Sequence, residues 1–258
     1  MIDVHNHILH DIDDGARGLE ESVELVKEAK KAGFDKIIST SHYMEGYYEA
    51  DSNERKELID ELKEELKKQS VDIKIYLGNE IYLSSNIIKL LEEEKASTLN
   101  GTDYVLFEMP LNIKPLNLYE IIYKIQSNKK IPILAHPERY TFVQEDIQLI
   151  YDLIEKGVLM QANFASIVGV YGKNAQKTVK HLFKNDMVHL LGSDTHRKGT
   201  IYKEMPRILN VLKEFIGEDR LTELTQTNPE RVLDNEKIFI RKPQKRKQTI
   251  FERIIKRK

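Results

Sequence analysis

Cysteine is absent from the 258 residues of this chain. A thiolate nucleophile, the reactive group of one large class of phosphatases and proteases, is therefore excluded. The lack of cysteine is also typical of proteins made in a reducing compartment, so we expect a cytoplasmic location. No apolar run is long enough to cross a membrane. The first residues show neither the basic nor the apolar segment of a signal peptide, so none is expected.

The net charge of −2 conceals a strong asymmetry along the chain. Residues 241–258 carry nine Lys or Arg and one acid, which leaves 31 basic and 41 acidic side chains in residues 1–240. An acidic body argues against broad nucleic-acid binding. The basic tail places Ile250, Phe251, Ile254 and Ile255 at helical spacing. Two interpretations stay open: a solvated terminus, or an amphipathic helix that contacts an anionic membrane surface or an acidic partner.

Strand-like and helix-like patterns alternate from the first residue. Apolar stripes at helical spacing, such as Leu58, Leu62 and Leu66, separate seven short β-rich runs. The runs are Ile2–His7, Lys36–His42, Ile73–Tyr82, Tyr104–Met109, Ile131–His136, Val158–Ala165 and Val188–His196. Strands that alternate with helices form parallel βαβ units. We therefore predict a closed or nearly closed (β/α) barrel in one domain, residues 1–240, followed by the tail.

Ionisable side chains stand where six of these runs end. They are His5 and His7, His42, Glu80, Glu108, His136, and Asp194 with His196. Side chains two apart on a strand point to the same side, so each pair can reach one cation. In a parallel barrel the carboxyl ends of the strands meet at one face, where barrel enzymes keep their chemistry. These residues are therefore expected to lie together.

Each of these residues alone has an ordinary explanation. A single histidine at a strand end is more often a hydrogen-bonded structural residue, and Asp194 alone could cap a helix. Several gathered carboxylates, however, are costly without a counter-charge, which divalent cations supply. Mixed imidazole and carboxylate ligands suit manganese, iron or zinc. The number of ligands predicts more than one ion, with Glu80 placed to bridge two. Asp14 is a further candidate ligand, or a turn residue before Gly15. His189 is expected in the core, and His10 either near the site or in a loop.

The ordered motifs resemble the polymerase-and-histidinol-phosphatase (PHP) superfamily, and more narrowly its bacterial protein-tyrosine phosphatases from capsule and exopolysaccharide loci. The resemblance covers residues 1 to about 235 and rests on Met1–His7, Asp13–Gly15, Ser39–His42, Gly78–Tyr82, Phe107–Glu108, Ala135–Tyr140 and Gly192–His196. It implies a distorted (β/α)7 barrel with three metal ions, most favourably Mn²⁺. It also implies a substrate, the tyrosine-rich tail of a membrane-associated, autophosphorylating bacterial tyrosine kinase.

Residue roles follow from the same motifs. The resemblance implies a metal cluster of His5, His7, Asp14, His42, Glu80, Glu108, His136, Asp194 and His196. Arg139 matches the phosphate-orienting arginine, although an ion pair with Glu138 is the ordinary alternative. Glu80, His136 and Arg139 are the expected catalytic residues. Tyr43 and Tyr47, with Tyr48, are expected to be loop aromatics that stack on the substrate ring, and Arg197 to add positive charge at the mouth. A different PHP-type phosphoesterase (a histidinol phosphatase or a nuclease) and a non-catalytic phosphotyrosine-binding partner of the kinase stay open as alternatives.

Overall fold

The computed structural model describes residues 1–243. Their strands are β1 (Ile2–Asp3), β2 (Lys36–Ser39), β3 (His42–Tyr43), β4 (Lys74–Leu77), β5 (Glu80–Tyr82), β6 (Tyr104–Glu108), β7 (Ile131–Ala135), β8 (Leu159–Asn163) and β9 (Leu190–Gly192). All seven predicted runs contain a strand. Two of them are interrupted: the second run supplies β2 and β3, and the third supplies β4 and β5.

The strands form a ring. β1, β2 and β4 make one parallel sheet, and β3, β5, β6, β7, β8 and β9 make another. The two sheets continue into each other, because β2 leads into β3 and β4 into β5. A parallel bridge between Asn6 and Thr195 joins the last predicted run to the first. The backbone N–H groups of His7 and Asp194 donate across the same junction, to Thr195 O at 2.9 Å and His5 O at 2.7 Å. The predicted distorted barrel is therefore confirmed.

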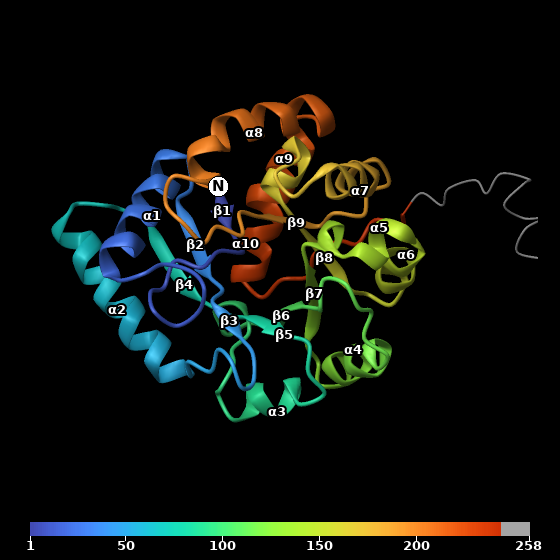
Figure 1. The fold of residues 1–258 in the computed structure, drawn as a ribbon, viewed down its shortest axis with the longest axis horizontal. Helices are drawn as coiled ribbons and strands as arrows, with labels where there is room; N and C mark the ends of the chain where they lie inside the picture. The colour runs from blue at the N-terminus through green and yellow to red at the C-terminus, as the bar shows by residue number, and fades with distance from the viewer. Residues whose placement is uncertain (244–258) are drawn as a thin grey trace, which may run out of the picture.

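The helices lie on the outside of the ring except for α10, which is seen at the middle of the ring (Figure 1). They are α1 (Leu19–Lys31), α2 (Ser52–Lys68), α3 (Ile87–Glu92), α4 (Leu118–Ser127), α5 (Thr141–Glu145), α6 (Gln148–Glu155), α7 (Lys173–Lys184), α8 (Ile201–Ile216), α9 (Glu218–Thr222) and α10 (Asn228–Leu233). Each long helix buries one apolar stripe, as Ile59, Leu62 and Leu66 of α2 show. None of the helices in residues 1–243 combines the length and the apolar composition that a membrane span requires.

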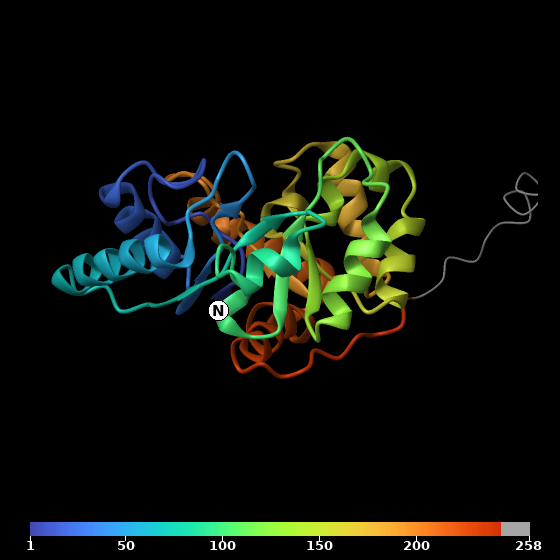
Figure 2. The same cartoon turned by 90° about the horizontal axis from the view of Figure 1, so that it is seen from below.

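The apolar core has two parts. The larger lies between the strands and the surrounding helices, and the smaller fills the barrel interior with side chains such as Leu106, Ile133 and Leu190. Val232 and Leu233 of α10 belong to the interior cluster. In Figure 2 this C-terminal part of the chain, drawn in red, lies along one end of the barrel. That end is closed by apolar packing, so the polar residues gather at the opposite end.

Most of the predicted basic tail lies outside the described residues. Arg241, the first of its basic residues, pairs with Glu223 at 2.6 Å and with Asp186 at 3.4 Å. The apolar residues from Ile250 onward are not described, so their helical arrangement and membrane contact stay predictions.

Candidate metal centre

The predicted ligands converge at the carboxyl ends of the strands. A pocket of about 310 Å³ opens there, lined by Asp14, His42, Glu80, Glu108, Leu111, His136, Arg139, Tyr171, Asp194 and His196. His5 and His7 lie beneath it and are fully buried. The structure therefore brings together all nine residues that were predicted as metal ligands.

Among residues 1–243, three groups of side chains are compact enough to hold an ion each. They are His5, His7, Glu80 and Asp194; His7, Asp14, His42 and His196; and His42, Glu80 and Glu108. Within each group the ligand atoms all lie within 4.8 Å of one another. His7, His42 and Glu80 each belong to two groups. Shared ligands are the feature expected of a cluster of ions rather than of separate sites.

The carboxylate of Glu80 lies at the centre of the cluster. Its Oε2 is 3.0 Å from His5 Nε2, 3.4 Å from His7 Nε2 and 3.2 Å from His42 Nδ1. Its Oε1 is 2.9 Å from His136 Nε2. Four imidazole nitrogens thus face one buried carboxylate. This position fits the bridging role that the sequence suggested for Glu80.

The hydrogen bonds behind the histidines show that the site fits divalent cations. Gln161 Oε1 lies 2.7 Å from His5 Nδ1, and Asp13 Oδ2 lies 2.8 Å from His7 Nδ1. Both acceptors favour a proton on Nδ1, which leaves the Nε2 lone pair for a ligand. The two Nε2 atoms are only 3.3 Å apart and both face Glu80. Lone pairs that converge in this way repel one another unless a proton or a cation lies between them.

Protons fill this role when no cation is bound. Burial by itself lowers the pKa of His5, but the charges of Glu80 and Asp194 outweigh it and raise the pKa to about 9. The same balance, with Glu80 and Glu108 as the acids, raises the pKa of His42 to about 10. Glu80 itself has a pKa well below its ordinary value, because burial is outweighed by the facing imidazoles. The acids therefore demand positive charge, and bound cations would replace the imidazolium protons.

The two carboxylate oxygens of Asp194 have different surroundings: one faces the histidines of the cluster, and the other accepts hydrogen bonds from residues outside it. Oδ1 lies 3.6 Å from His5 Nε2 and 3.5 Å from His196 Nδ1. Oδ2 accepts from Asn163 Nδ2 at 2.7 Å and from the Arg139 guanidinium at 2.5 Å. The two outer donors hold the carboxylate in one orientation, as neighbours of a metal ligand commonly do.

Arg139 forms one wall of the pocket. Only one of its terminal nitrogens bonds to Asp194, and its side chain is 26% exposed. The guanidinium carbon lies 4.7 Å from the centre of the Tyr171 ring, a cation–π contact. Glu138, the alternative partner, instead accepts from Ser166 Oγ and Asn163 N. The remaining N–H groups have no acceptor among the described residues and border the pocket.

The predicted substrate-contact residues need correction. Tyr43 is 3% exposed and belongs to the apolar core, because neighbouring side chains on β3 point to opposite faces and His42 points to the site. Tyr47 is 76% exposed and does not line the pocket. The Arg197 guanidinium bonds to Gly15 O and lies 3.9 Å from Glu21, also outside the pocket lining. Tyr48, whose ring stacks on His42 at 5.8 Å, is the tyrosine of that loop nearest the ligands.

Five residues of the site were not predicted: Asp13, Leu111, Gln161, Asn163 and Tyr171. The prediction rests on histidines and acids at strand ends, whereas β8 ends in amides. Gln161 and Asn163 face the site from that strand, two residues apart. The same spacing rule would have found them had amides been included. Asp13 stands next to the predicted Asp14, but its role depends on loop geometry.

A buried arginine supports the site from behind. Arg55 of α2 is 1% exposed, and its guanidinium bonds to the Asn79 side chain and to Ser52 and Ser97. Asn79 in turn donates to Ser41 O at 2.8 Å. Asn79 and Ser41 directly precede the ligands Glu80 and His42. This network therefore holds the two short connections, from β2 to β3 and from β4 to β5, after which those candidate ligands follow.

The remaining histidines behave differently. His189 is 2% exposed and its Nδ1 accepts from Met160 N at 3.0 Å. Burial, helped by Arg220, lowers its pKa to about 3, so the prediction of a core residue is confirmed. His10 lies in a loop, 3.0 Å from Asp11 and 3.4 Å from Glu61.

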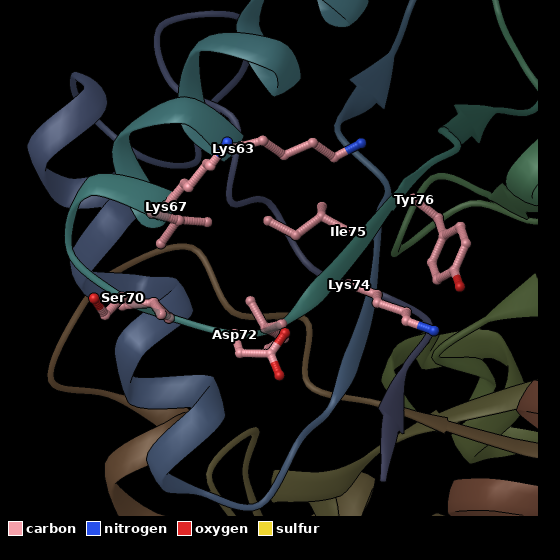
Figure 3. A pocket seen from close by; sticks show the side chains of 10 residues that line it. Lys63, Lys67, Ser70, Asp72, Lys74, Ile75 and Tyr76 are labelled. Carbon is pink, nitrogen blue, oxygen red and sulfur yellow. The ribbon is translucent and has the colours of Figure 1, made fainter.

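A second, larger hollow of about 590 Å³ lies away from these ligands (Figure 3). It is bordered by Lys63 and Lys67 of α2 and by Lys74 and Ile75 of β4, with Asp72 as its single acid. It contains no histidine. Within the described part of the chain, the candidate ligand groups therefore lie at the smaller pocket and not at this larger hollow.

A parallel barrel with imidazole and carboxylate ligands clustered at the carboxyl ends of its strands has the architecture of a metal-dependent hydrolase. Solved structures agree. One solved chain is 32% identical to this one, with a TM-score of 0.90, and the match covers 96% of this chain and 100% of the other. It belongs to "Crystal structures of YwqE from Bacillus subtilis and CpsB from Streptococcus pneumoniae, unique metal-dependent tyrosine phosphatases". A histidinol phosphate phosphatase from Lactococcus lactis, 14% identical with a TM-score of 0.56 over 83% of this chain and 93% of its own, shares the fold.

The particular family follows from the sequence comparisons. The model of the family "Capsular polysaccharide synthesis, CpsB/CapC" matches residues 1–234. Tyrosine-protein phosphatase YwqE of Bacillus subtilis (strain 168) is 32% identical over 244 residues, 95% of this chain and 96% of its own. Tyrosine-protein phosphatase CpsB of Streptococcus pneumoniae is 28% identical over 90% of this chain and 98% of its own. The chain belongs to the CpsB/CapC family, which confirms the resemblance seen in its motifs.

Proposed function

We propose that this protein is a metal-dependent protein-tyrosine phosphatase, with residues 1–240 as a single catalytic domain and three Mn²⁺ ions as its cofactor. The observation that carries the proposal is the cluster around Glu80: three ligand groups that share side chains beneath one small pocket with Arg139 on its wall. The names of the relatives support the same activity, since proteins called tyrosine-protein phosphatases match nearly the whole chain.

Each part of the pocket has a role in this reaction. Divalent cations held by the three ligand groups would supply Lewis acidity and lower the pKa of water towards neutrality. The N–H groups of Arg139 not bonded to Asp194 would hold phosphoryl oxygens and offset their charge. Tyr171 and Leu111 would border the phenyl ring. A tyrosinate leaving group, with a pKa of about 10, needs less help from an acid than a serine alkoxide does.

The substrate proposed is a phosphotyrosine protein, in particular the tyrosine-rich tail of a membrane-associated bacterial tyrosine kinase that controls capsule or exopolysaccharide synthesis. The names of the relatives support a phosphotyrosine protein as substrate, and the family description supports a link to capsule synthesis. Contact of the basic tail with the membrane is part of the same proposal.

Phosphate release tests the proposal directly. Metal-stripped protein is supplied with Mn²⁺, Zn²⁺ or Fe²⁺ and offered a phosphotyrosine peptide, histidinol phosphate and single-stranded DNA in parallel. Free phosphate is measured for the two monoesters, and released nucleotides are measured for the DNA. We expect turnover of the peptide above the other two, activation by Mn²⁺, loss on adding EDTA, and no effect of thiol-alkylating reagents. Elemental analysis gives the number of ions. Preference for histidinol phosphate or DNA, or stoichiometric peptide binding without phosphate release from metal-loaded protein, would overturn it.

A further inference from the structure

Helix α7 carries a lysine stripe, which we define as Lys173, Lys177, Lys180 and Lys184. The spacing of four, three and four residues places these side chains on one face of the helix. The opposite face is apolar and buried, with residues such as Val179 and Leu182. No aspartate or glutamate occurs between residues 173 and 184. The formally charged side chains of α7 are therefore all basic, although residues 1–240 as a whole are acidic.

The lysine stripe has no acidic partner in the described part of the chain. None of its four ammonium groups forms an ion pair there, and Lys184 instead lies over the Phe215 ring at 5.7 Å. Other helices pair their lysines with nearby glutamates, as Lys124 does with Glu120 at 2.8 Å. Like charges three or four residues apart repel and weaken a helix. The stripe thus carries a cost in stability that no ion pair within residues 1–243 offsets.

The stripe begins at the rim of the candidate site. Tyr171, which lines the pocket and contacts Arg139, is two residues before Lys173. Helix α7 also packs against the 3₁₀ turn η2 (Pro137–Arg139), which carries Arg139. Figure 1 shows α7 on the outside of the ring beside β8 and β9. A polypeptide that leaves the pocket past Tyr171 therefore meets the stripe first.

The stripe also has a suitable length and shape. Eleven residues of α-helix separate its ends, which is about 16 Å. An extended chain crosses this distance in about five residues. The side chains border a shallow hollow of about 410 Å³ that includes Gln176 and His181. Lysines are separate point charges, whereas phosphate groups are matched best by the fork of an arginine. The spread of single charges fits a run of carboxylates.

We propose that the lysine stripe docks a carboxylate-rich segment of the substrate polypeptide while its phosphotyrosine occupies the pocket. This inference rests on the proposed function and adds the class of sequence that the enzyme selects. The rate of the chemical step is set in the pocket, so the stripe affects KM and leaves kcat unchanged. Screening makes its contribution fall as salt concentration rises.

The test compares two matched variants, Lys173→Gln/Lys177→Gln on α7 and Lys63→Gln/Lys67→Gln on α2. Both pairs are exposed, four residues apart and unpaired with acids in the described chain, and both variants change the net charge equally. Substrates are p-nitrophenyl phosphate and phosphotyrosine peptides flanked, on either side, by four glutamates or four glutamines. An exposed ion pair changes affinity by roughly two-fold.

At low salt we expect the KM of wild type to be about ten-fold lower for the glutamate-flanked peptide than for the glutamine-flanked one. In the α7 variant this ratio of KM values should be about four-fold smaller. The α2 variant should keep the wild-type ratio, and all three proteins should turn over p-nitrophenyl phosphate equally. Equal KM for both peptides in wild type, or equal losses in both variants, would overturn the inference.

Two further measurements separate other causes. Binding of a labelled, unphosphorylated glutamate-rich peptide to metal-free protein reports on the stripe even if the phosphatase assay fails. If this peptide binds the wild-type protein and the α2 variant equally but binds the α7 variant more weakly, the inference is supported independently of the proposed function. If instead the α7 variant loses co-sedimentation with phosphatidylserine vesicles while its peptide KM stays at the wild-type value, the stripe contacts membranes and the inference is wrong.

Discussion

Replacement of Asp13 by asparagine is expected to weaken metal binding without unfolding the loop. Asp13 Oδ2 accepts from His7 Nδ1 at 2.8 Å and from His42 N at 2.9 Å, and Oδ1 accepts from Gly15 N at 2.8 Å. Asparagine has a single acceptor oxygen, so its NH2 group must face one of these donors. If the oxygen stays with Gly15, His7 must move its proton to Nε2, which removes the lone pair that faces the cluster.

The magnitude follows from what such supporting residues contribute. Loss of the residue that orients a histidine ligand lowers metal affinity about 10- to 100-fold, or roughly 1.4 to 2.7 kcal/mol. Manganese titration by calorimetry and by activity should both show this shift, with activity recovering at high Mn²⁺. Asp11→Asn is the matched control, because Asp11 lies in the same loop but its side chain is 67% exposed and its carboxylate pairs, within residues 1–243, with His10 alone. Unchanged manganese affinity in Asp13→Asn would refute this assignment of the His7 tautomer.

Three other predictions concern the pocket and the core. Arg139→Lys keeps a positive charge near Asp194 but loses the planar guanidinium, so kcat/KM on a phosphotyrosine peptide should fall about 100-fold, which is the free energy of hydrogen bonds to a charged group. A loss of metal content in this variant would instead show that Arg139 has a structural role. Tyr171→Leu should raise KM for phosphotyrosine by about three- to ten-fold, with little change for an alkyl phosphate, and equal changes for both would argue against ring stacking. His189, with a pKa of about 3 in the folded protein against 6.5 unfolded, is neutral when folded, so its contribution is intact above pH 6.5 and is lost as pH falls below it. The free energy of unfolding of the metal-free wild-type protein should therefore fall between pH 7.5 and pH 5 by about 2 kcal/mol more than that of the His189→Asn variant. Parallel pH profiles of the two proteins would contradict the lowered pKa of His189.

The sequence by itself determined the barrel and predicted the candidate ligands that the structure brings together. Strand and helix periods differ, so the alternation of seven runs with amphipathic helices is readable along the chain. Because parallel strands end at one face, His5, Glu80, His136 and Asp194 could be placed together without coordinates. The family motifs added Arg139, and its place on the pocket wall agrees with that choice.

Only the tertiary structure decided which neighbours orient these ligands. Asp13, Gln161 and Asn163 are identified by hydrogen bonds that depend on loop paths and on side chains from different strands, and no local period encodes either. Tyr43 marks the boundary: the alternation of a strand places it opposite His42, in the core, whereas a loop would have left it exposed. Periodicity therefore fixes which face a residue takes within a regular element. Where the chain leaves that element, packing between distant segments sets the contact.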